Sequence, residues 1–155
     1  MPATIRVQAE PIDAVAETAA ALRGDGRAGA VTTFIGLCRD EGGRLSALEL
    51  EHYPGMAEAE LTRIAEEAAR RCTLLGVTVI HRHGRVRPGE TIVFVATAAA
   101  HRAEAFAAAE FLMDFLKTRA PFWKREHLAD GTVGPWVEAR HADDEAAGRW
   151  EPAGA

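Results

Sequence analysis

Cysteine is scarce in this chain of 155 residues, which contains only Cys38 and Cys72. The two form neither a CxxC pair nor a disulfide framework, so we expect free thiols in a reducing compartment. The sequence also lacks a run of about 20 apolar residues, the length that a membrane-spanning helix requires. Residues Met1–Thr4 hold no basic segment followed by an apolar run, as a secretory leader would. We therefore predict a cytoplasmic protein that does not enter membranes.

An excess of positive charge is also missing. The formal net charge is -5 and the sequence pI is about 5.7. Because proteins that bind nucleic acids usually carry a basic surface, we predict no nucleic-acid partner, and any anion site must be local. The composition, 48% hydrophobic and 26% charged, is that of an ordinary globular protein. We predict a single domain over residues 1–150 and a flexible tail over residues 151–155.

Hydrophobic periodicity divides the chain into strands and helices. Strands are predicted at Thr4–Gln8, Ala28–Leu37, Leu45–Tyr53, Val77–His81 and Thr91–Thr97, with a last short strand at Trp136–Ala139. Helices are predicted at Ile12–Leu22, Met56–Cys72 and His101–Thr118, with a short helix at Asp143–Trp150. We expect the strand at 28–37 to be buried, the strand at 91–97 to be central, and Lys124–Arg125 to form a basic turn after Pro121.

Several cationic residues stand at the ends of these elements. The pair His101–Arg102 opens a helix directly after an apolar strand, where free backbone N–H groups and the helix dipole favour an anion. An arginine adds a planar fork that matches phosphate oxygens, and a histidine adds a further donor. The pattern predicts a phosphate site, although a helix end that merely faces water would give the same pattern. Arg39, at a junction of strand and loop, is either a second anion contact or a solvated surface charge.

The length of the helix at 101–118 limits how these cations can act together. Lys117 follows His101 by 16 residue steps, which is about 24 Å along a helix at ~1.5 Å per residue. One small ligand cannot touch both ends within one chain. Either only some of the cations matter or a second copy completes the site, and we expect a homodimer whose apolar helix faces are buried between subunits.

Lys117 and Lys124 flank the turn at Pro121, and we expect them to converge on one pocket with Trp123 as a wall. Neighbouring cations and partial desolvation both favour the neutral amine, so we expect a lowered lysine pKa and a usable base or nucleophile. The alternative for Lys117 is structural, because a lysine in the last turn of a helix interacts favourably with the helix dipole and with Asp114.

Two other groups of residues allow weaker hypotheses. His81 and His83 share one face of a strand, but a third metal ligand is not evident, so we predict no metal site. Cys38 beside Arg39 could be a stabilised thiolate that carries sulfur, or a buried and inert thiol, which its apolar strand favours.

Five segments together resemble the catalytic large subunit of molybdopterin synthase. They are Glu51–Met56 (EHYPGM), Val79–Arg82 (VIHR), Gly89–Val95 (GETIVFV), Ala100–Arg102 (AHR) and Lys117–Glu126 (KTRAPFWKRE). The resemblance covers about residues 29–150, and the last segment is the most specific. The chain departs from the family pattern around Arg39, with Cys38 in place of an aliphatic residue and a short acidic loop at 40–43.

This resemblance implies an α/β (α+β) hammerhead-type fold with an additional small antiparallel sheet. It also implies a dimer of large subunits with a small ubiquitin-like subunit at each end, and no cofactor. The small subunit's C-terminal Gly-Gly thiocarboxylate would sulfurate cyclic pyranopterin monophosphate twice to give molybdopterin. The family's functional positions match Arg39, His101, Arg102, Lys117, Lys124, Arg125, Glu126 and, less directly, Arg140, with Lys117 and Lys124 as the catalytic pair.

Two other functions compete with this one. Cys38 could act as a persulfide carrier in a self-contained sulfurtransferase, which full activity of a Cys38→Ser variant would exclude. A protein with the same pocket could also be a non-catalytic adaptor that grips the tail of a ubiquitin-like partner. Formation of product from precursor and thiocarboxylated partner separates an enzyme from an adaptor.

Overall fold

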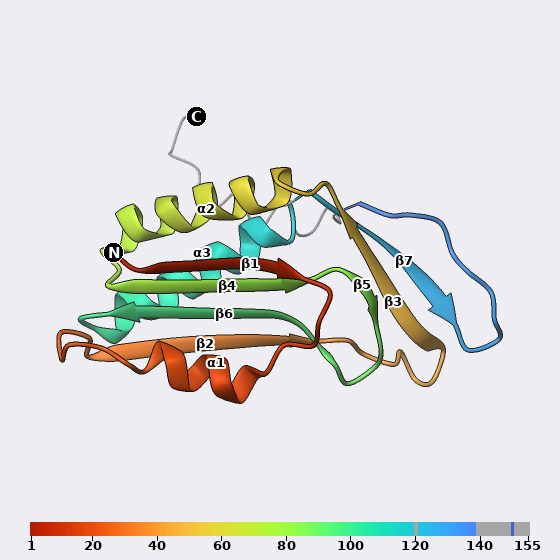
Figure 1. Ribbon diagram of the computed structural model, residues 1–155, viewed down its shortest axis with the longest axis horizontal. Helices are drawn as coiled ribbons and strands as arrows, with labels where there is room; N and C mark the ends of the chain where they lie inside the picture. The colour runs from red at the N-terminus through yellow and green to blue at the C-terminus, as the bar shows by residue number, and fades with distance from the viewer. Residues whose placement is uncertain (120, 139–149, 151–155) are drawn as a thin grey trace.

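The computed structural model describes residues 1–119, 121–138 and 150 (Figure 1). The helices in this part are α1 (Ala14–Ala21), α2 (Met56–Cys72) and α3 (Arg102–Leu116). The strands are β1 (Ala3–Gln8), β2 (Ala30–Leu37), β3 (Leu45–His52), β4 (Gly76–Arg82), β5 (Gly84–Val86), β6 (Thr91–Ala99) and β7 (Phe122–Leu128). The α/β fold class is confirmed, including the small additional sheet. No helix within the described residues is long and apolar enough to span a membrane.

The larger sheet has four strands in the order β1-β4-β6-β2. β1 runs parallel to β4, and the other neighbours are antiparallel. β6 lies between β4 and β2, as its nearly continuous apolar sequence predicted, and residues 92–97 of this strand are all buried. A strand with neighbours on both edges and helices over both faces needs apolar side chains on each face.

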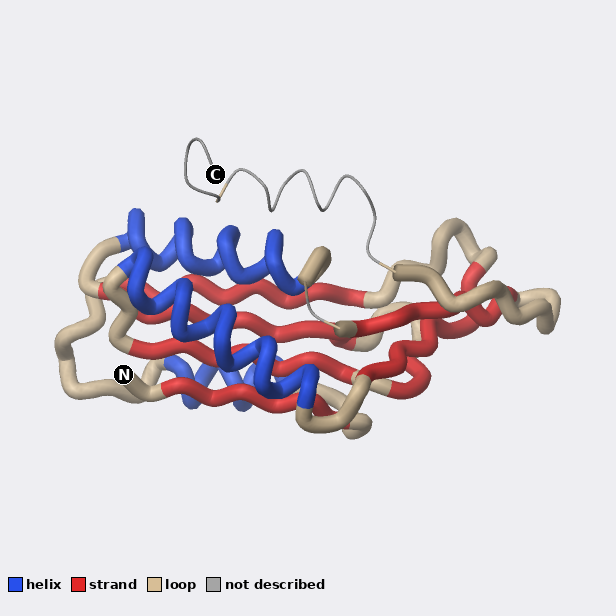
Figure 2. Tube along the Cα trace, turned by 90° about the horizontal axis from the view of Figure 1, so that it is seen from above, coloured by secondary structure: helices blue, strands red, loops and turns tan. Residues whose placement is uncertain are grey.

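Helices cover both faces of this sheet (Figures 1 and 2). On one face α2 and α3 enclose the main core, in which Leu61 and Phe111 pack with Val79 and Val95. On the other face the shorter α1 lies over a smaller cluster around Phe94. The exposed Phe106 marks the solvent side of α3, whose other face supplies seven buried residues.

The smaller sheet has the order β5-β3-β7 and lies at one end of the larger sheet (Figure 1). β3 and β7 are antiparallel, with Leu50 opposite Lys124 and His52 opposite Phe122. Leu50 belongs to a third apolar cluster that includes Val86 of β5. The end of β4 leads directly into β5, so the two sheets meet around residues 81–84.

Three predictions about the strands were wrong. Lys124–Arg125 is not a turn, because both residues lie within β7 and pair with β3. β2 is an edge strand with exposed Phe34 and Leu37, so its apolar sequence does not reflect burial. Within its described residues, 136–138, the predicted last strand contributes only a single bridge, from Val137 to Lys124. The short β5 had no counterpart in the prediction.

The helix boundaries agree more closely. α1 is shorter than predicted because the Asp13 side chain accepts a hydrogen bond from the Ala16 N–H and so begins the helix there. α2 matches its prediction; its first turn is closed by Glu58, which accepts from the Gly55 N–H at 2.7 Å. The helix predicted at 143–150 falls, apart from Trp150, outside the described residues, and so does the tail at 151–155.

Candidate active site

Lys117 and Lys124 come from different elements at the same end of the molecule. Lys117 is the C-terminal cap of α3, and Lys124 lies in the middle of β7. Because alternate residues of a strand share a face, Lys124 projects from the same side of the small sheet as Phe122 and His52. This side of the small sheet contacts the end of β4 through aromatic and imidazole rings.

Four rings gather at the junction of the two sheets. The imidazole of His81 stacks on the phenyl ring of Phe122, with centroids 4.0 Å apart and planes inclined by 17°. The ring of His52 lies 6.1 Å from Phe122 and 4.5 Å from His83. We call these four residues the ring cluster. It joins β4 to β3 and β7 immediately beside Lys124.

His81 is the most buried member of the ring cluster, with 7% of its surface exposed. Its Nδ1 lies 2.8 Å from the carbonyl oxygen of Arg82, which can only accept, so Nδ1 carries the proton. Burial lowers the pKa of His81 to about 4; the hydrogen bond to Arg82 opposes this shift, and the charges of Lys117 and His52 add to it. The side chain is therefore neutral at physiological pH, and Lys117 lies close enough to influence it.

The other side of β7 carries a separate polar network. Glu49 accepts hydrogen bonds from Arg125 Nε at 2.9 Å and from His127 Nε2 at 2.8 Å, which lowers the pKa of this carboxyl. The Arg125 guanidinium also lies 4.5 Å from the centre of the Trp136 ring. Trp123 points to this side too, so it is not the wall between the two lysines that the sequence predicted.

Glu126 lies on the Lys124 side of β7 but toward the far end of the strand. Its carboxylate accepts from Arg44 at 2.8 Å, and both side chains remain about half exposed. Arg39 follows β2 in an exposed loop, where it pairs with Glu41 at 3.3 Å. Arg140 lies outside the described residues.

His101 and Arg102 stand at the opposite end of α3, at the rim of a pocket of about 510 Å³ that is also lined by Gly29 and Ala100. His101 is the N-cap residue, and among the described residues its side chain makes no capping hydrogen bond. The first-turn N–H groups are thus in the arrangement that favours an anion.

Lys117 lies close enough to His81 for its charge to act on the imidazole, and Lys124 follows Phe122 by two residues on the same face of β7. His101 and Arg102 stand at the other end of α3. Along α3 the two ends are separated by about 24 Å. Gly29 precedes β2 and Arg39 follows it. The strand spans about 23 Å at ~3.3 Å per residue, so these two residues lie at opposite ends of it. The predicted site residues therefore form two groups within one chain.

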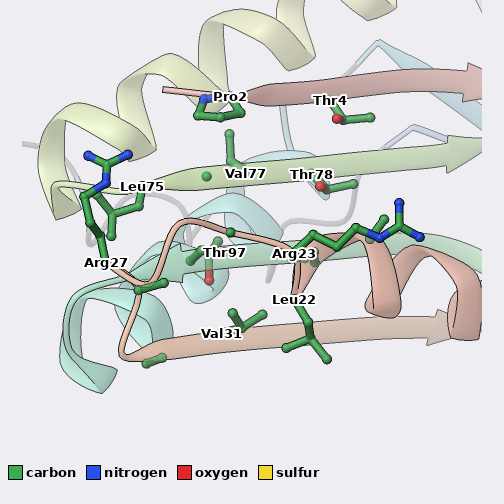
Figure 3. Close-up of a pocket in the computed structure, with 18 of the residues that line it drawn as sticks. Pro2, Thr4, Leu22, Arg23, Arg27, Val31, Leu75, Val77, Thr78 and Thr97 are labelled. Atoms are coloured by element: carbon green, nitrogen blue, oxygen red, sulfur yellow. The ribbon is translucent and has the colours of Figure 1, made fainter.

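A second pocket of about 510 Å³ lies between the sheet and the loop after α1 (Figure 3). Thr4, Val77 and Thr97 form part of its lining, and Arg23 and Arg27 border it (Figure 3). Arg27 is held by Asp25 at 2.7 Å. None of the predicted site residues that the structure describes lines this pocket.

The sequence did not single out His52 or Phe122. The available signals were the alternation in residues 45–53, which places His52 on the Leu50 face, and the two-residue spacing of Phe122 and Lys124. Cys38 is 3% exposed, and burial raises the pKa of its thiol, so it lacks the properties of a thiolate nucleophile.

A mixed four-stranded sheet with two helices on one face and a small antiparallel sheet at its end defines a class of solved proteins. A MoaE protein from Burkholderia ambifaria has this fold, with a TM-score of 0.82 and 50% identity over 96% of this chain and 97% of that one. The fold also matches a chain solved as the "protein-protein complex of subunit 1 and 2 of Molybdopterin-converting factor" of Helicobacter pylori. That match has a TM-score of 0.64 and 18% identity, and it covers 90% of each chain.

The sequence comparisons are more specific. The family model described as "MoaE protein" matches residues 7–119. The molybdopterin synthase catalytic subunit of Mesorhizobium japonicum is 62% identical over 148 residues, which cover 96% of this chain and 93% of that protein. The chain belongs to the MoaE family. Its role is that of a molybdopterin synthase catalytic subunit, an enzyme of molybdenum cofactor biosynthesis, which excludes the adaptor hypothesis.

Proposed function

We propose that this chain transfers two sulfur atoms to cyclic pyranopterin monophosphate from the C-terminal thiocarboxylate of a small ubiquitin-like subunit. The observation that carries this proposal is the position of Lys117 and Lys124. They stand on two different elements near the ring cluster, of which His81 is buried. A pair of amines held in this way can serve a reaction in which sulfur enters and oxygen leaves.

The two lysines would move protons. Attack by sulfur must be coupled to the loss of an oxygen atom, so a group that donates a proton to the leaving oxygen is required. Lys117 and Lys124 would fill this role, and their positive charge would also attract the incoming carboxyl-terminal tail.

The phosphate of the precursor would bind at the start of α3. His101 and Arg102 offer side-chain donors beside the free N–H groups of the first turn. Because this end is about 24 Å from Lys117 along the helix, the phosphate site and the lysines would come from two copies of the chain. Arg39, Arg125, Glu126 and Arg140 would add substrate contacts.

The assembly we propose is a homodimer of this chain with one small subunit at each end. A fold relative solved as a two-subunit complex supports such a partnership. Two free and buried thiols, Cys38 and Cys72, fit a reducing compartment, and the cytoplasm remains our expectation.

The test is reconstitution from purified parts. The chain is mixed with a thiocarboxylated small subunit and cyclic pyranopterin monophosphate, and the dithiolene product is measured. We expect product that depends on all three components and two sulfur atoms consumed per pterin. A mixture that consumes thiocarboxylate but makes no dithiolene would contradict the proposed reaction.

A further inference from the structure

His81 is buried and close to Lys117, yet it has no role in the chemistry proposed above. Its ring is fixed from two directions. The Nδ1–H donates to the Arg82 carbonyl at 2.8 Å, and one face of the ring stacks on Phe122 at 4.0 Å. A ring held by both a hydrogen bond and a stacking partner has little rotational freedom, so it can fix the position of whatever packs against it.

The anchor behind His81 is itself immobilised. Arg82 is 5% exposed, and its guanidinium donates to the carbonyl oxygens of Ala9 at 2.8 Å and Arg85 at 3.2 Å. It also lies 3.4 Å from a carboxylate oxygen of Glu90. These contacts tie the end of β4 to the segment after β1 and to β5. The carbonyl that accepts from His81 is therefore part of a rigid junction.

The contact between His81 and Phe122 also affects the position of the lysines. Phe122 begins β7, and Lys124 follows two residues later on the same face, about 7 Å along the strand. Lys117 ends α3 close enough to His81 for its charge to act on the imidazole. His81 is thus in contact with the strand that bears one lysine and near the helix end that bears the other.

We propose that His81 is a positioning residue of the sulfur-transfer site, which holds Phe122 and therefore Lys124 at a fixed separation from Lys117. The inference rests on the proposed function, because it assigns the two lysines to one reaction. His81 does not itself touch the reacting atoms. Its contribution is geometric, and misplacing a reacting group by about 1 Å can cost about 100-fold in rate.

A dependence on pH follows from the same geometry. The ionisable groups that act on His81 are Lys117 of α3 and His52 of β3, and the His52 pKa is itself lowered by burial and by His83. Glu51 and Glu58 oppose that second shift. A proton on His81 would place a cation in a buried site beside Lys117, a cost that the attraction of a cation to the face of the Phe122 ring offsets only in part. The ring cluster should therefore loosen in acid.

The test compares matched truncations of two aromatic contacts. Phe122→Leu removes the ring beneath His81, whereas Phe111→Leu removes one ring of the Phe111–Phe115 pair, 4.8 Å apart, within the main core. Phe111 is fully buried and Phe122 is only half-buried, so the control variant loses at least as much packing as the test variant. We expect Phe122→Leu to lower kcat about 10- to 100-fold with little change in KM, and Phe111→Leu to leave the kcat of the folded enzyme unchanged.

Replacement of His81 gives the second arm. His81→Phe keeps a flat ring against Phe122, whereas His81→Ala removes it. We expect His81→Ala to lose activity as Phe122→Leu does, and His81→Phe to recover most of it with a weaker acid limb in its pH profile. Equal loss in both His81 variants, or normal kcat in Phe122→Leu, would overturn the proposal.

A third readout does not depend on catalysis. Lys117 and Lys124 are the only lysines of the chain, so an amine-acylating reagent followed by peptide mass spectrometry reports the reactivity of each. Phe122→Leu should change their relative reactivity, whereas Phe111→Leu should not. No dithiolene from the wild type would count against the proposed function, whereas unchanged lysine reactivity in Phe122→Leu would count against positioning by His81.

Discussion

The backbone of Gly29 passes so close to Ala100 that a Cβ on Gly29 would lie 2.2 Å from the Ala100 carbonyl oxygen. The Gly29 N–H also donates to the Ala99 carbonyl at 3.0 Å, which fixes this approach. Ala100 immediately precedes His101, the N-cap of α3. Gly29, immediately before β2, therefore sets the position of the proposed phosphate site.

Gly29→Ala should weaken binding of the phosphorylated precursor. The added methyl must displace residues 99–101, which carries His101 and Arg102 away from their place, and we expect KM to rise about 10-fold. Gly76→Ala is the matched control, because a Cβ there would lie 3.7 Å from the Ala98 Cβ, an ordinary contact. Steady-state kinetics of both variants decide the matter, and an unchanged KM in Gly29→Ala would refute the assignment.

Removal of either lysine should stop sulfur transfer and leave the protein folded. Lys117→Ala and Lys124→Ala should each lower turnover by at least about 100-fold, the usual effect of losing a proton-transfer group. Arg63→Ala on α2, which removes only an exposed pair with Glu60, serves as a control and should behave as wild type. Single-turnover assays with thiocarboxylated small subunit measure the effect, and near-normal turnover of either lysine variant would exclude that lysine from the chemistry.

Cys38 should be dispensable for the reaction. Its thiol is buried in the cluster with Leu50 and Val86, and burial raises its pKa, so it forms little thiolate. Cys38→Ala should keep wild-type turnover and lose only about 1 kcal/mol of stability or slightly more from the small cavity. Loss of activity from a folded Cys38→Ala protein would restore the persulfide hypothesis.

Protein stability should decline in mild acid because of His81. Burial lowers the pKa of His81 from 6.5 to about 4, so the folded state keeps the ring neutral while the unfolded chain takes up a proton. The stability is complete above pH 6.5 and falls as the pH drops toward 4, by up to about 3 kcal/mol at ~1.36 kcal/mol per pKa unit.

Urea unfolding at about pH 7.5 and about pH 4.5 measures this difference. His81→Phe has no group to titrate and should lose most of the dependence, whereas the Phe111→Leu protein should keep it. If the wild type and His81→Phe lose the same free energy of unfolding between these two values, another group is responsible.

The regular elements were predictable where one local signal dominated. The position and type of β6 and α3 could be predicted from the sequence. A strand buried on both faces leaves a short continuous apolar run, and a helix buried along one side leaves a longer apolar stripe. β7 was not predictable in this way. Lys124 and Arg125 resemble turn residues, and only pairing with Leu50 and Glu49 of the distant β3 makes them a strand.

The candidate site shows the same division. Chemistry and spacing were enough to select Lys117, Lys124 and the His101–Arg102 pair. The helix length also placed His101–Arg102 far from Lys117, and the two do cap opposite ends of α3. The ring cluster could not be selected. His52, His81 and Phe122 meet only through the register of β3 with β7 and the approach of β4, and long-range register leaves no mark on a single sequence.

We propose that the lysines of one copy act on a substrate held by His101 and Arg102 of another. Coexpression of Lys117→Ala chains with Arg102→Ala chains tests it directly, since each variant alone has no complete site. In a mixed dimer one of the two sites regains both residues, so random pairing should restore about a quarter of wild-type dithiolene formation. Activity that stays at the level of the separate variants, in a preparation where mixed dimers are shown to be present, would contradict the account.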